Sequence, residues 1–195
     1  CAKKETPLTA QQIVDKTFVR SGADKVGSAQ IRFQFRDKKY AAIRKKGTFY
    51  LERTALNTTS KIRDVISNEG FQRFEDDTPI TVADTMAVKY RNSINSVHYF
   101  SVLPYGLNDK AVQKKLLPSS VVAGKDYFKV MITFLEDGGG EDFEDVFVYW
   151  IGKEDFLIDY LAYTFHTNGG GKRFRVLKEQ CNIKGIRFVD YNNYQ

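Results

Sequence analysis

The sequence contains few of the residues that carry metal, redox or nucleophilic chemistry. Its 195 residues include only two cysteines and two histidines, and no C-x-x-C, H-E-x-x-H or G-x-S-x-G pattern occurs. The 24 acidic residues are spread along the chain, so no glycosidase-like pair of carboxylates can be singled out. We therefore predict a protein that is not an enzyme, with no catalytic residue, no metal site and no cofactor.

Long apolar runs are also missing, since no stretch approaches the roughly 18 residues of a membrane-spanning helix. The first residue is Cys1, which is what bacterial lipoprotein maturation leaves at the start of a processed chain. We predict that Cys1 carries a lipid anchor and that the polar residues 1–8 form a tether. The alternative is that the sequence begins at an arbitrary cut. The other cysteine, Cys181, is either a small buried residue or a free thiol.

Positive charge is concentrated near this predicted anchor. Residues 1–50 hold 12 Lys and Arg against 4 Asp and Glu, whereas the remainder holds 18 against 20. Two interpretations remain open: these cations face anionic lipid headgroups, or they form an ordinary solvated surface. Basic and aromatic residues alternate in KKYAAIRKKGTFY as in single-strand binders, but the excess is confined to one quarter of the chain. We therefore predict no nucleic-acid partner.

Hydrophobic periodicity predicts helices at two places. Thr9 and Gln12 form a capping box before a helix over 10–21, and Gly22 is suited to end it. A second helix is expected from about 82 to 101, capped at Thr81. A further short helix is expected from Asn108 to Leu116 and ended by Pro118. Alternating patterns predict strands over the rest of the chain, at 30–36, 39–45, 48–55, 61–67, 70–76, 127–134, 145–152, 156–166, 172–179 and 185–194.

These elements predict an α+β fold with one domain over residues 9–195. Its curved antiparallel sheet has an apolar, Phe- and Tyr-rich face that must be covered. The first helix and the predicted helical insert at about 82–117 are the available covers. This arrangement resembles the lipoprotein-carrier fold of LolA, LolB and the mycobacterial LppX, a half-open antiparallel barrel with a lid of helices over an apolar cavity.

Longer motifs resemble a family of uncharacterised lipoproteins from Bacteroidota. These include F-x-F-R-x-K-x-Y from Phe33 to Tyr40, N-E-G-F from Asn68 to Phe71, and the segments NSVHYFSVLPYGLND and YLAYTFHTNGGGKRFR. The resemblance covers nearly the whole chain from about residue 10. It implies an outer-membrane-anchored lipoprotein of the cell envelope, with a soluble domain that is periplasmic or surface-exposed, and it implies no activity. Ser21-Gly22 departs from the family's usual paired glycines.

The leading hypothesis from the sequence is a monomeric domain that binds or carries a lipid or another hydrophobic molecule. Ten apolar residues of the insert helix and the sheet face are the predicted lining of its cavity: Phe33, Phe35, Met86, Tyr90, Ile94, Val97, Phe100, Phe128, Val130 and Ile132. An ordinary packed core is the alternative, because an apolar stripe at helical spacing usually serves that role. His98 lies near the same stripe and is interpreted as a buried, hydrogen-bonded core residue.

Two Gly-rich loops support an alternative function, a structural lipoprotein that contacts another envelope component through 136–145 and 166–175. The first loop carries six carboxylates, which either bind a hard cation such as Ca²⁺ or form a solvated hairpin tip. The second loop is basic and is interpreted as a hairpin tip, and in a functional alternative it pairs with the first loop. Within it, His166 and Arg173 are expected to lie close together across the turn, as a candidate polar site.

Overall fold

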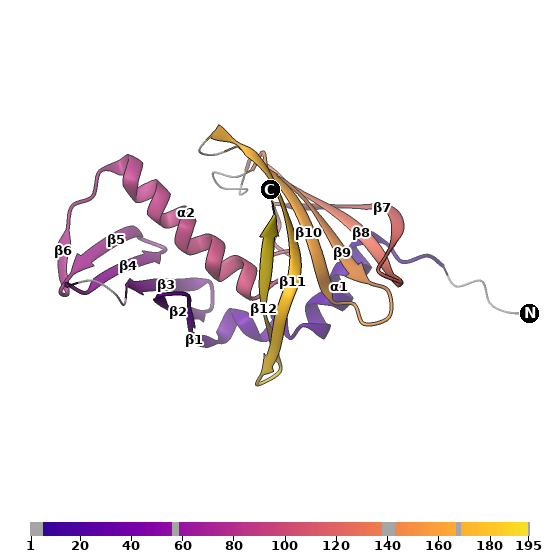
Figure 1. Ribbon diagram of the computed structural model, residues 1–195, viewed down its shortest axis with the longest axis horizontal. Coiled ribbons are helices and arrows are strands. Elements are labelled where there is room, and N and C mark those ends of the chain that lie inside the picture. The colour runs from indigo at the N-terminus through magenta and orange to yellow at the C-terminus, as the bar shows by residue number, and fades with distance from the viewer. Residues whose placement is uncertain (1–5, 56–58, 138–142, 167–168, 195) are drawn as a thin grey trace, which may run out of the picture. The chain divides into compact units, whose positions relative to one another are not determined.

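The computed structural model describes residues 6–55, 59–137, 143–166 and 169–194. The fold is α+β, with few helices and two six-stranded antiparallel sheets (Figure 1). In both sheets each strand pairs with its neighbours in sequence. We call β1–β6 the N-sheet and β7–β12 the C-sheet. Residues 1–5, which include the predicted lipidation site Cys1 and most of the tether, lie outside the described part of the chain.

The described chain forms two compact units. The N-sheet unit runs from Asp24 to Val102 without interruption. The C-sheet unit combines the residues up to Ala23 with those from Leu103 onward. No helix of the described residues has the length and hydropathy needed to cross a membrane.

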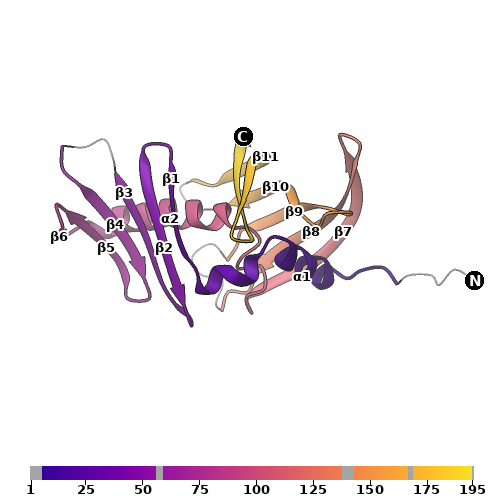
Figure 2. The ribbon, with the colours of Figure 1, turned by 90° about the horizontal axis from the view of Figure 1, so that it is seen from below.

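Helix α1 (Ala10–Arg20) forms as the sequence predicts. Gln12 N–H donates to Thr9 Oγ1 at 3.2 Å, and Thr9 N–H donates to Gln12 Oε1 at 2.9 Å, which completes the capping box. Its apolar face is fully buried at Ile13 and Val14, and it lies against the C-sheet at β7 (Figure 2). Gly22 follows the helix with a φ of +67°, as predicted for a left-handed cap.

The N-sheet is a meander covered on one face by helix α2 (Figures 1 and 2). Its strands are β1 (Gln30–Phe35), β2 (Lys38–Lys45), β3 (Thr48–Ala55), β4 (Ile62–Ser67), β5 (Gly70–Glu75) and β6 (Thr78–Ile80), after the short 3-10 helix η1 (Ala23–Ser28). Helix α2 spans Asp84–Ser101, and its N-cap is Ala83 without a side-chain hydrogen bond. The predicted cap at Thr81 is therefore wrong, although the helix itself is confirmed.

The second short helix predicted from Asn108 to Leu116 is wrong. The chain makes turns after α2 and then enters strand β7 (Val112–Val122). Pro118 does not end a helix: it lies in this edge strand, where the register with β8 shifts between Leu117 and Ser120. Proline is tolerated at an edge strand or bulge because its missing N–H breaks no ladder bond there.

The C-sheet continues with five strands that the sequence patterns predict: β8 (Lys125–Phe134), β9 (Val146–Gly152), β10 (Ile158–Phe165), β11 (Gly171–Ile183) and β12 (Ile186–Tyr194). One of its faces forms a dense core, in which Val130, Tyr149 and Leu161 are directly opposite one another and 0% exposed. Cys181 on β11 is an exposed free thiol, so the alternative of a buried cysteine is wrong.

Candidate ligand-binding site

One row of residues crosses the N-sheet beneath helix α2. The strand registers pair Phe33 with Tyr40, Tyr40 with Arg53, Arg53 with Asp64, and Asp64 with Arg73. Because directly opposed residues of neighbouring strands share a face, all five side chains lie on the same side of the sheet. The row is aromatic at β1 and β2 and charged from β3 to β5.

The charged half of the row centres on Asp64, whose side chain is 2% exposed. Arg53 Nη2 donates to its Oδ2 at 2.6 Å, and Arg73 Nε donates to its Oδ1 at 2.6 Å. Both oxygens of the carboxylate are thus paired, as a buried carboxylate requires. The hydrogen bond with Asp64 raises the pKa of Arg73, so this guanidinium stays charged. The cluster carries one net positive charge under α2.

Three polar contacts hold α2 on this row. The Tyr90 ring stacks on Arg73, with 3.6 Å from the guanidinium carbon to the ring centroid. Arg53 Nη1 donates to Ser93 Oγ at 3.0 Å. His98 Nε2 donates to the backbone carbonyl of Glu52 at 3.2 Å. The helix is therefore fixed from Tyr90 to its C-terminal end.

His98 is a satisfied core residue, as the sequence predicts. It is 2% exposed, and its ring meets those of Phe33 and Tyr40 edge-on at 5.7 and 5.6 Å. Burial lowers its pKa to about 4, and the positive charge of Arg44 acts in the same direction. The hydrogen bond to the Glu52 carbonyl opposes that shift. The imidazole is therefore neutral at pH 7 and closes the aromatic end of the row.

Few residues of α2 are fully buried against the N-sheet. Of the 18 residues of α2 only Ile94, His98 and Phe100 are buried, and Met86 is 37% exposed one turn before Tyr90. Val97 and Phe33 are half-buried. The core face of the C-sheet differs, because several of its apolar residues reach 0% exposure. The first turn of α2 therefore exposes apolar surface at Met86.

The ten predicted lining residues are divided between the two units. Seven belong to the N-sheet unit, where Phe33 and Phe35 lie on β1 and the other five on α2. The three on β8 belong to the C-sheet unit. Of these, Val130 and Ile132 are 0% exposed core residues, and Phe128 stacks on Phe156 at 6.1 Å. Of the seven N-sheet members, Ile94 and Phe100 are buried and the other five are partly exposed.

The two residues of the predicted polar site, Arg173 and His166, contact different residues. Arg173 is opposite Tyr163 in the β10–β11 register, and its guanidinium lies 5.0 Å from the Phe165 ring. His166 instead contacts Asp145: its backbone N–H donates to Oδ1 at 3.2 Å, and Nδ1 lies 3.4 Å from the same oxygen. This contact joins the start of the basic loop to the end of the acidic loop.

Part of the acidic loop falls outside the described residues, including Glu141 and Asp142 of its six carboxylates. The remaining four are Glu136, Asp137, Glu144 and Asp145. Among the residues that the structure does describe, no group of three or more His, Cys, Asp or Glu is arranged to hold a metal ion.

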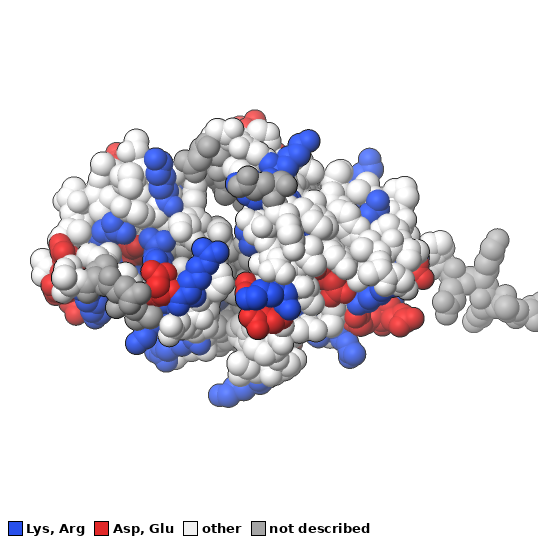
Figure 3. Space-filling model, in the orientation of Figure 1, with Lys and Arg blue, Asp and Glu red and all other residues white. Residues whose placement is uncertain are grey.

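A hollow of about 700 Å³ lies over β1–β3 and Thr59–Lys61. Its lining combines the aromatic residues Phe33 and Tyr40 of the row with charged residues, which are Arg32, Lys39, Glu52 and Lys61. Arg32 and Glu52 each alternate with a residue of the α2-facing row, so their side chains belong to the opposite face of the sheet. In Figure 3, Lys and Arg side chains mix with Asp and Glu over this unit.

The sequence predictions missed the cluster of Arg53, Asp64 and Arg73. Its signal was nevertheless present. In TFYLERTA, alternation places Arg53 on the same face as the buried Leu51, and in GFQRFE it places Arg73 on the face of Phe71. A positive, a negative and a positive charge at inward positions of three successive strands indicate a buried ion network.

Comparisons with known proteins bear on the whole chain. Residues 8–195 match a model described as Family of unknown function (DUF6503). A LolA superfamily protein from Nitrosomonas europaea is similar in structure, with 14% sequence identity and a TM-score of 0.52 over 95% of this chain and 92% of that chain. A DUF1329 family protein from Desulfovibrio piger has 16% identity and a TM-score of 0.43 over 91% and 83%. A search of curated proteins found no match. The first structure confirms the predicted LolA-like fold.

Proposed function

The chain belongs to the family of unknown function DUF6503, and we propose that it binds or carries a lipid or another hydrophobic molecule without catalysing a reaction. Two findings support this proposal: the LolA-like fold and the exposed apolar surface at the first turn of α2. The observation that carries it concerns one face of α2. Met86 on this face is 37% exposed, and Tyr90, one turn later on the same face, contacts the sheet.

The polar anchors of α2 suggest how a ligand enters. They hold the helix from Tyr90 onward, whereas Met86 in its first turns is 37% exposed. An acyl chain that slides under these turns removes apolar surface from water, with a gain of about 0.8 kcal/mol for each buried methylene. In this proposal the Arg53–Asp64–Arg73 cluster stays intact and marks the inner end of the site.

The same proposal includes the location of the protein. We propose a monomeric lipoprotein of the bacterial cell envelope, anchored in the outer membrane through a lipid on Cys1, with the domain in the periplasm or on the cell surface. The basis is the sequence resemblance to Bacteroidota lipoproteins, carried by the motifs from Phe33 to Tyr40 and from Asn68 to Phe71. Mass spectrometry of the protein isolated from native membranes tests it, because a diacylglycerol mass on the N-terminal peptide is expected.

Binding is tested with a dansyl-labelled fatty acid as the probe. The full chain is expected to bind it with increased dansyl emission, and native mass spectrometry of the purified protein is expected to show a co-purified lipid. Replacing Met86 and Val97 together by lysine puts two charges into the apolar layer. We expect this variant to bind at least about tenfold more weakly, since a charge is costly to desolvate beside an acyl chain.

The matched control is Val19→Lys, because Val19 on α1 is 71% exposed and its replacement leaves the layer unchanged. Circular dichroism checks that both variants stay folded. Failure of the unmodified chain to bind the probe, together with the absence of any co-purified lipid, contradicts the proposal.

A second candidate function is a scaffold that contacts another envelope component. The observation in its favour is the contact between His166 and Asp145, which joins loops 136–145 and 166–175 into one surface with acidic and basic parts. Immobilised protein is expected to lose its bound partner when the charges of these loops are neutralised. An unchanged set of bound proteins argues against this alternative.

A further inference from the structure

The C-sheet has an apolar face on the side opposite its core. Two neighbouring rows of directly opposed residues cross all six strands on this side. We call these twelve residues the aromatic face: Leu117, Lys129, Trp150, Tyr160, Val176 and Asn192 in the first row, and Lys115, Met131, Val148, Ala162, Phe174 and Tyr194 in the second. Nine of the twelve are apolar or aromatic, although this side of an antiparallel sheet is usually polar.

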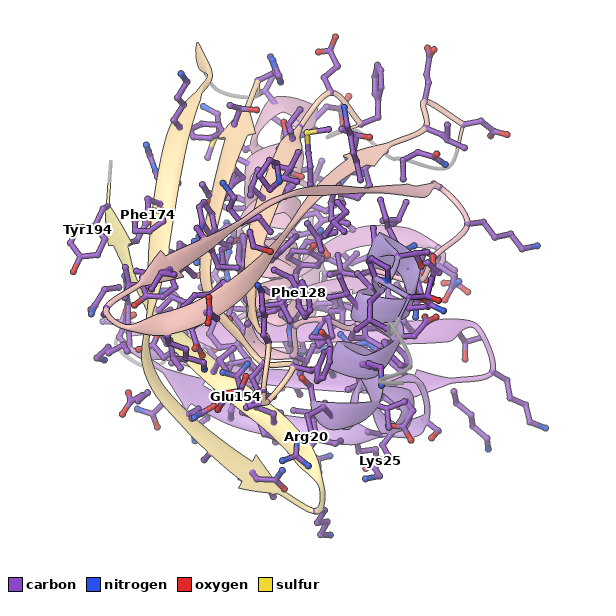
Figure 4. The ribbon with its side chains drawn as sticks, turned by 90° about the vertical axis from the view of Figure 1, so that its right-hand side faces the viewer. Arg20, Lys25, Phe128, Glu154, Phe174 and Tyr194 are labelled. Carbon is purple, nitrogen blue, oxygen red and sulfur yellow. The ribbon has the colours of Figure 1, made fainter. Side chains whose placement is uncertain are left out.

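None of these twelve side chains is buried. Phe174 is 38% exposed and Tyr194 is 52% exposed. The residues that alternate with them belong to the core, with Val130, Tyr149 and Leu161 at 0% exposure. Figure 4 shows Phe174 and Tyr194 together on the side of β11 and β12 that points away from α1. The aromatic face is therefore open to solvent and is not part of the core.

Its rings are already arranged by contacts with one another. The Tyr160 and Phe174 rings are nearly parallel, at 12° and 6.1 Å between centroids, and Trp150 meets Phe174 edge-on at 5.9 Å. Tyr194 is directly opposite Phe174 on the next strand. Because strand backbones hold these rings in place, docking them against a partner costs little conformational entropy.

The charges of the aromatic face have one sign. Lys115 and Lys129 lie in its two rows, and none of the twelve residues is acidic. The neighbouring rows carry Lys172 on one side and Glu179 with Asp190 on the other. A face with cations and no carboxylate repels a second copy of itself, so it does not suit a symmetric dimer. It suits an apolar surface that carries negative charge.

We infer that the aromatic face docks on an anionic lipid bilayer. Trp and Tyr prefer the headgroup level of a membrane, where the ring is apolar and its polar atom stays hydrated. Lysines extend their ammonium groups toward anionic headgroups while their stems lie along the apolar surface. This inference goes beyond the proposed function, because the aromatic face is separate from the layer under α2 and does not involve the N-terminal anchor.

The chain has a built-in reporter for this contact, since Trp150 is its only tryptophan. The experiment uses the full chain with Cys1→Ser, so that no lipid anchor contributes. Vesicles of phosphatidylcholine with phosphatidylglycerol are expected to shift Trp150 emission to the blue, and brominated phospholipids in them are expected to quench it. Vesicles of phosphatidylcholine alone are expected to bind about tenfold more weakly, because they lack the negative charge.

Variants locate the contact. Phe174→Ser with Tyr194→Ser is expected to weaken vesicle binding at least about tenfold, and Lys115→Glu with Lys129→Glu is expected to remove the preference for phosphatidylglycerol. The matched controls are Val121→Ser with Ile183→Ser, at positions that are 66% and 56% exposed in the same unit, and Lys45→Glu with Lys184→Glu, both exposed. Both control variants are expected to bind like the parent chain.

Three results overturn the inference. The first is no change in Trp150 emission with either kind of vesicle. The second is vesicle binding without quenching by brominated lipid, or equal loss in the control variants, since another surface is then responsible. The third is a concentration-dependent dimer that the Phe174/Tyr194 variant abolishes while vesicle binding persists, because the face then pairs with a second copy. The dansyl fatty acid assay is unaffected by these results, so the two proposals fail separately.

Discussion

Among single residues, Asp64 has the largest predicted effect on stability. Its carboxylate accepts hydrogen bonds from both Arg53 and Arg73 and is 2% exposed. We expect Asp64→Ala to lower the free energy of unfolding by about 3–5 kcal/mol, because two guanidinium groups are then left without their buried counter-charge. Urea unfolding followed by circular dichroism measures the change.

Asp37→Ala is the control for that substitution. Asp37 pairs with Lys38 at 2.8 Å, but its side chain is 47% exposed. The urea midpoint of this variant is expected to stay unchanged, because solvent screens exposed ion pairs. Equal effects of the two substitutions would mean that burial does not govern the strength of the Asp64 cluster.

His98 makes stability depend on pH. Its pKa is about 4 in the folded protein and 6.5 in the ordinary case. Above pH 6.5 the imidazole is neutral in both the folded and the unfolded chain, so it does not change the free energy of unfolding. As pH falls from 6.5 to 4, the unfolded chain binds the proton first, so stability declines by about 3 kcal/mol over this range. Urea unfolding at a series of pH values measures the decline.

His98→Gln removes the titrating group and keeps a side-chain N–H for the Glu52 carbonyl. The decline between pH 6.5 and 4 is expected to be smaller by that amount in this variant. His166→Gln serves as the control, because the His166 side chain is 56% exposed, and it is expected to follow the unmodified protein. The same slope in all three proteins would contradict the prediction.

For whole elements, Gly22 decides how α1 ends. Its φ is +67°, and a Cβ atom there overlaps the backbone carbonyl oxygen of Gly185 at the β11–β12 turn. Gly22→Ala is expected to destabilise by more than about 2 kcal/mol, because left-handed strain adds to a clash with backbone. Thermal unfolding monitored at 222 nm reports the loss.

Gly47 provides the comparison, since it has a φ of +83° but open space around its Cβ position. Gly47→Ala is expected to cost only about 1 kcal/mol, from the backbone conformation alone. If the two substitutions have the same cost, the close approach of Gly22 to Gly185 does not limit the packing of α1.

The elements also show what the sequence can predict. Helix α1 and the strands with strict alternation were predicted correctly because local signals, the capping box and the two-residue period, decide them. Strand β7 was not, because Lys114–Leu117 has no clear period and Pro118 resembles a helix stop. Its strand conformation comes from pairing with β8, a tertiary contact that a local pattern does not contain.

The candidate site was predicted in part for the same reason. Alternation placed Phe33 on the inward face and helical spacing placed Tyr90 on the sheet-facing side of α2, and both contact the opposite layer. Neither period distinguishes a filled core from an open layer. Val130 and Met86 belong to equally apolar patterns, yet one is 0% and the other 37% exposed, because exposure depends on which element covers each position.

In the whole molecule, the predicted tether and the fold are separable. Pro7 is exposed, whereas Thr9 begins the capping box and Ile13 is fully buried. Deleting residues 1–8 is expected to change the free energy of unfolding by less than about 0.5 kcal/mol. Deleting residues 1–21 is expected to destabilise the C-sheet unit so far that it shows no cooperative urea transition, because its core loses α1. Urea titrations of both truncated proteins measure the difference, and a stable second truncation contradicts this role of α1.

The route of the chain has a consequence for biosynthesis. Ser21 O, just after α1, accepts a hydrogen bond from Arg187 N–H on the last strand, yet the whole N-sheet unit is translated between them. Each sheet is a meander of sequential neighbours and has short loops to close as it emerges. Helix α1, with 11 residues, is too short to be stable alone in water. It is synthesised before both sheets, and we expect it to be among the last elements to fold. Its apolar face then stays exposed until a chaperone binds it or the β11–β12 hairpin forms.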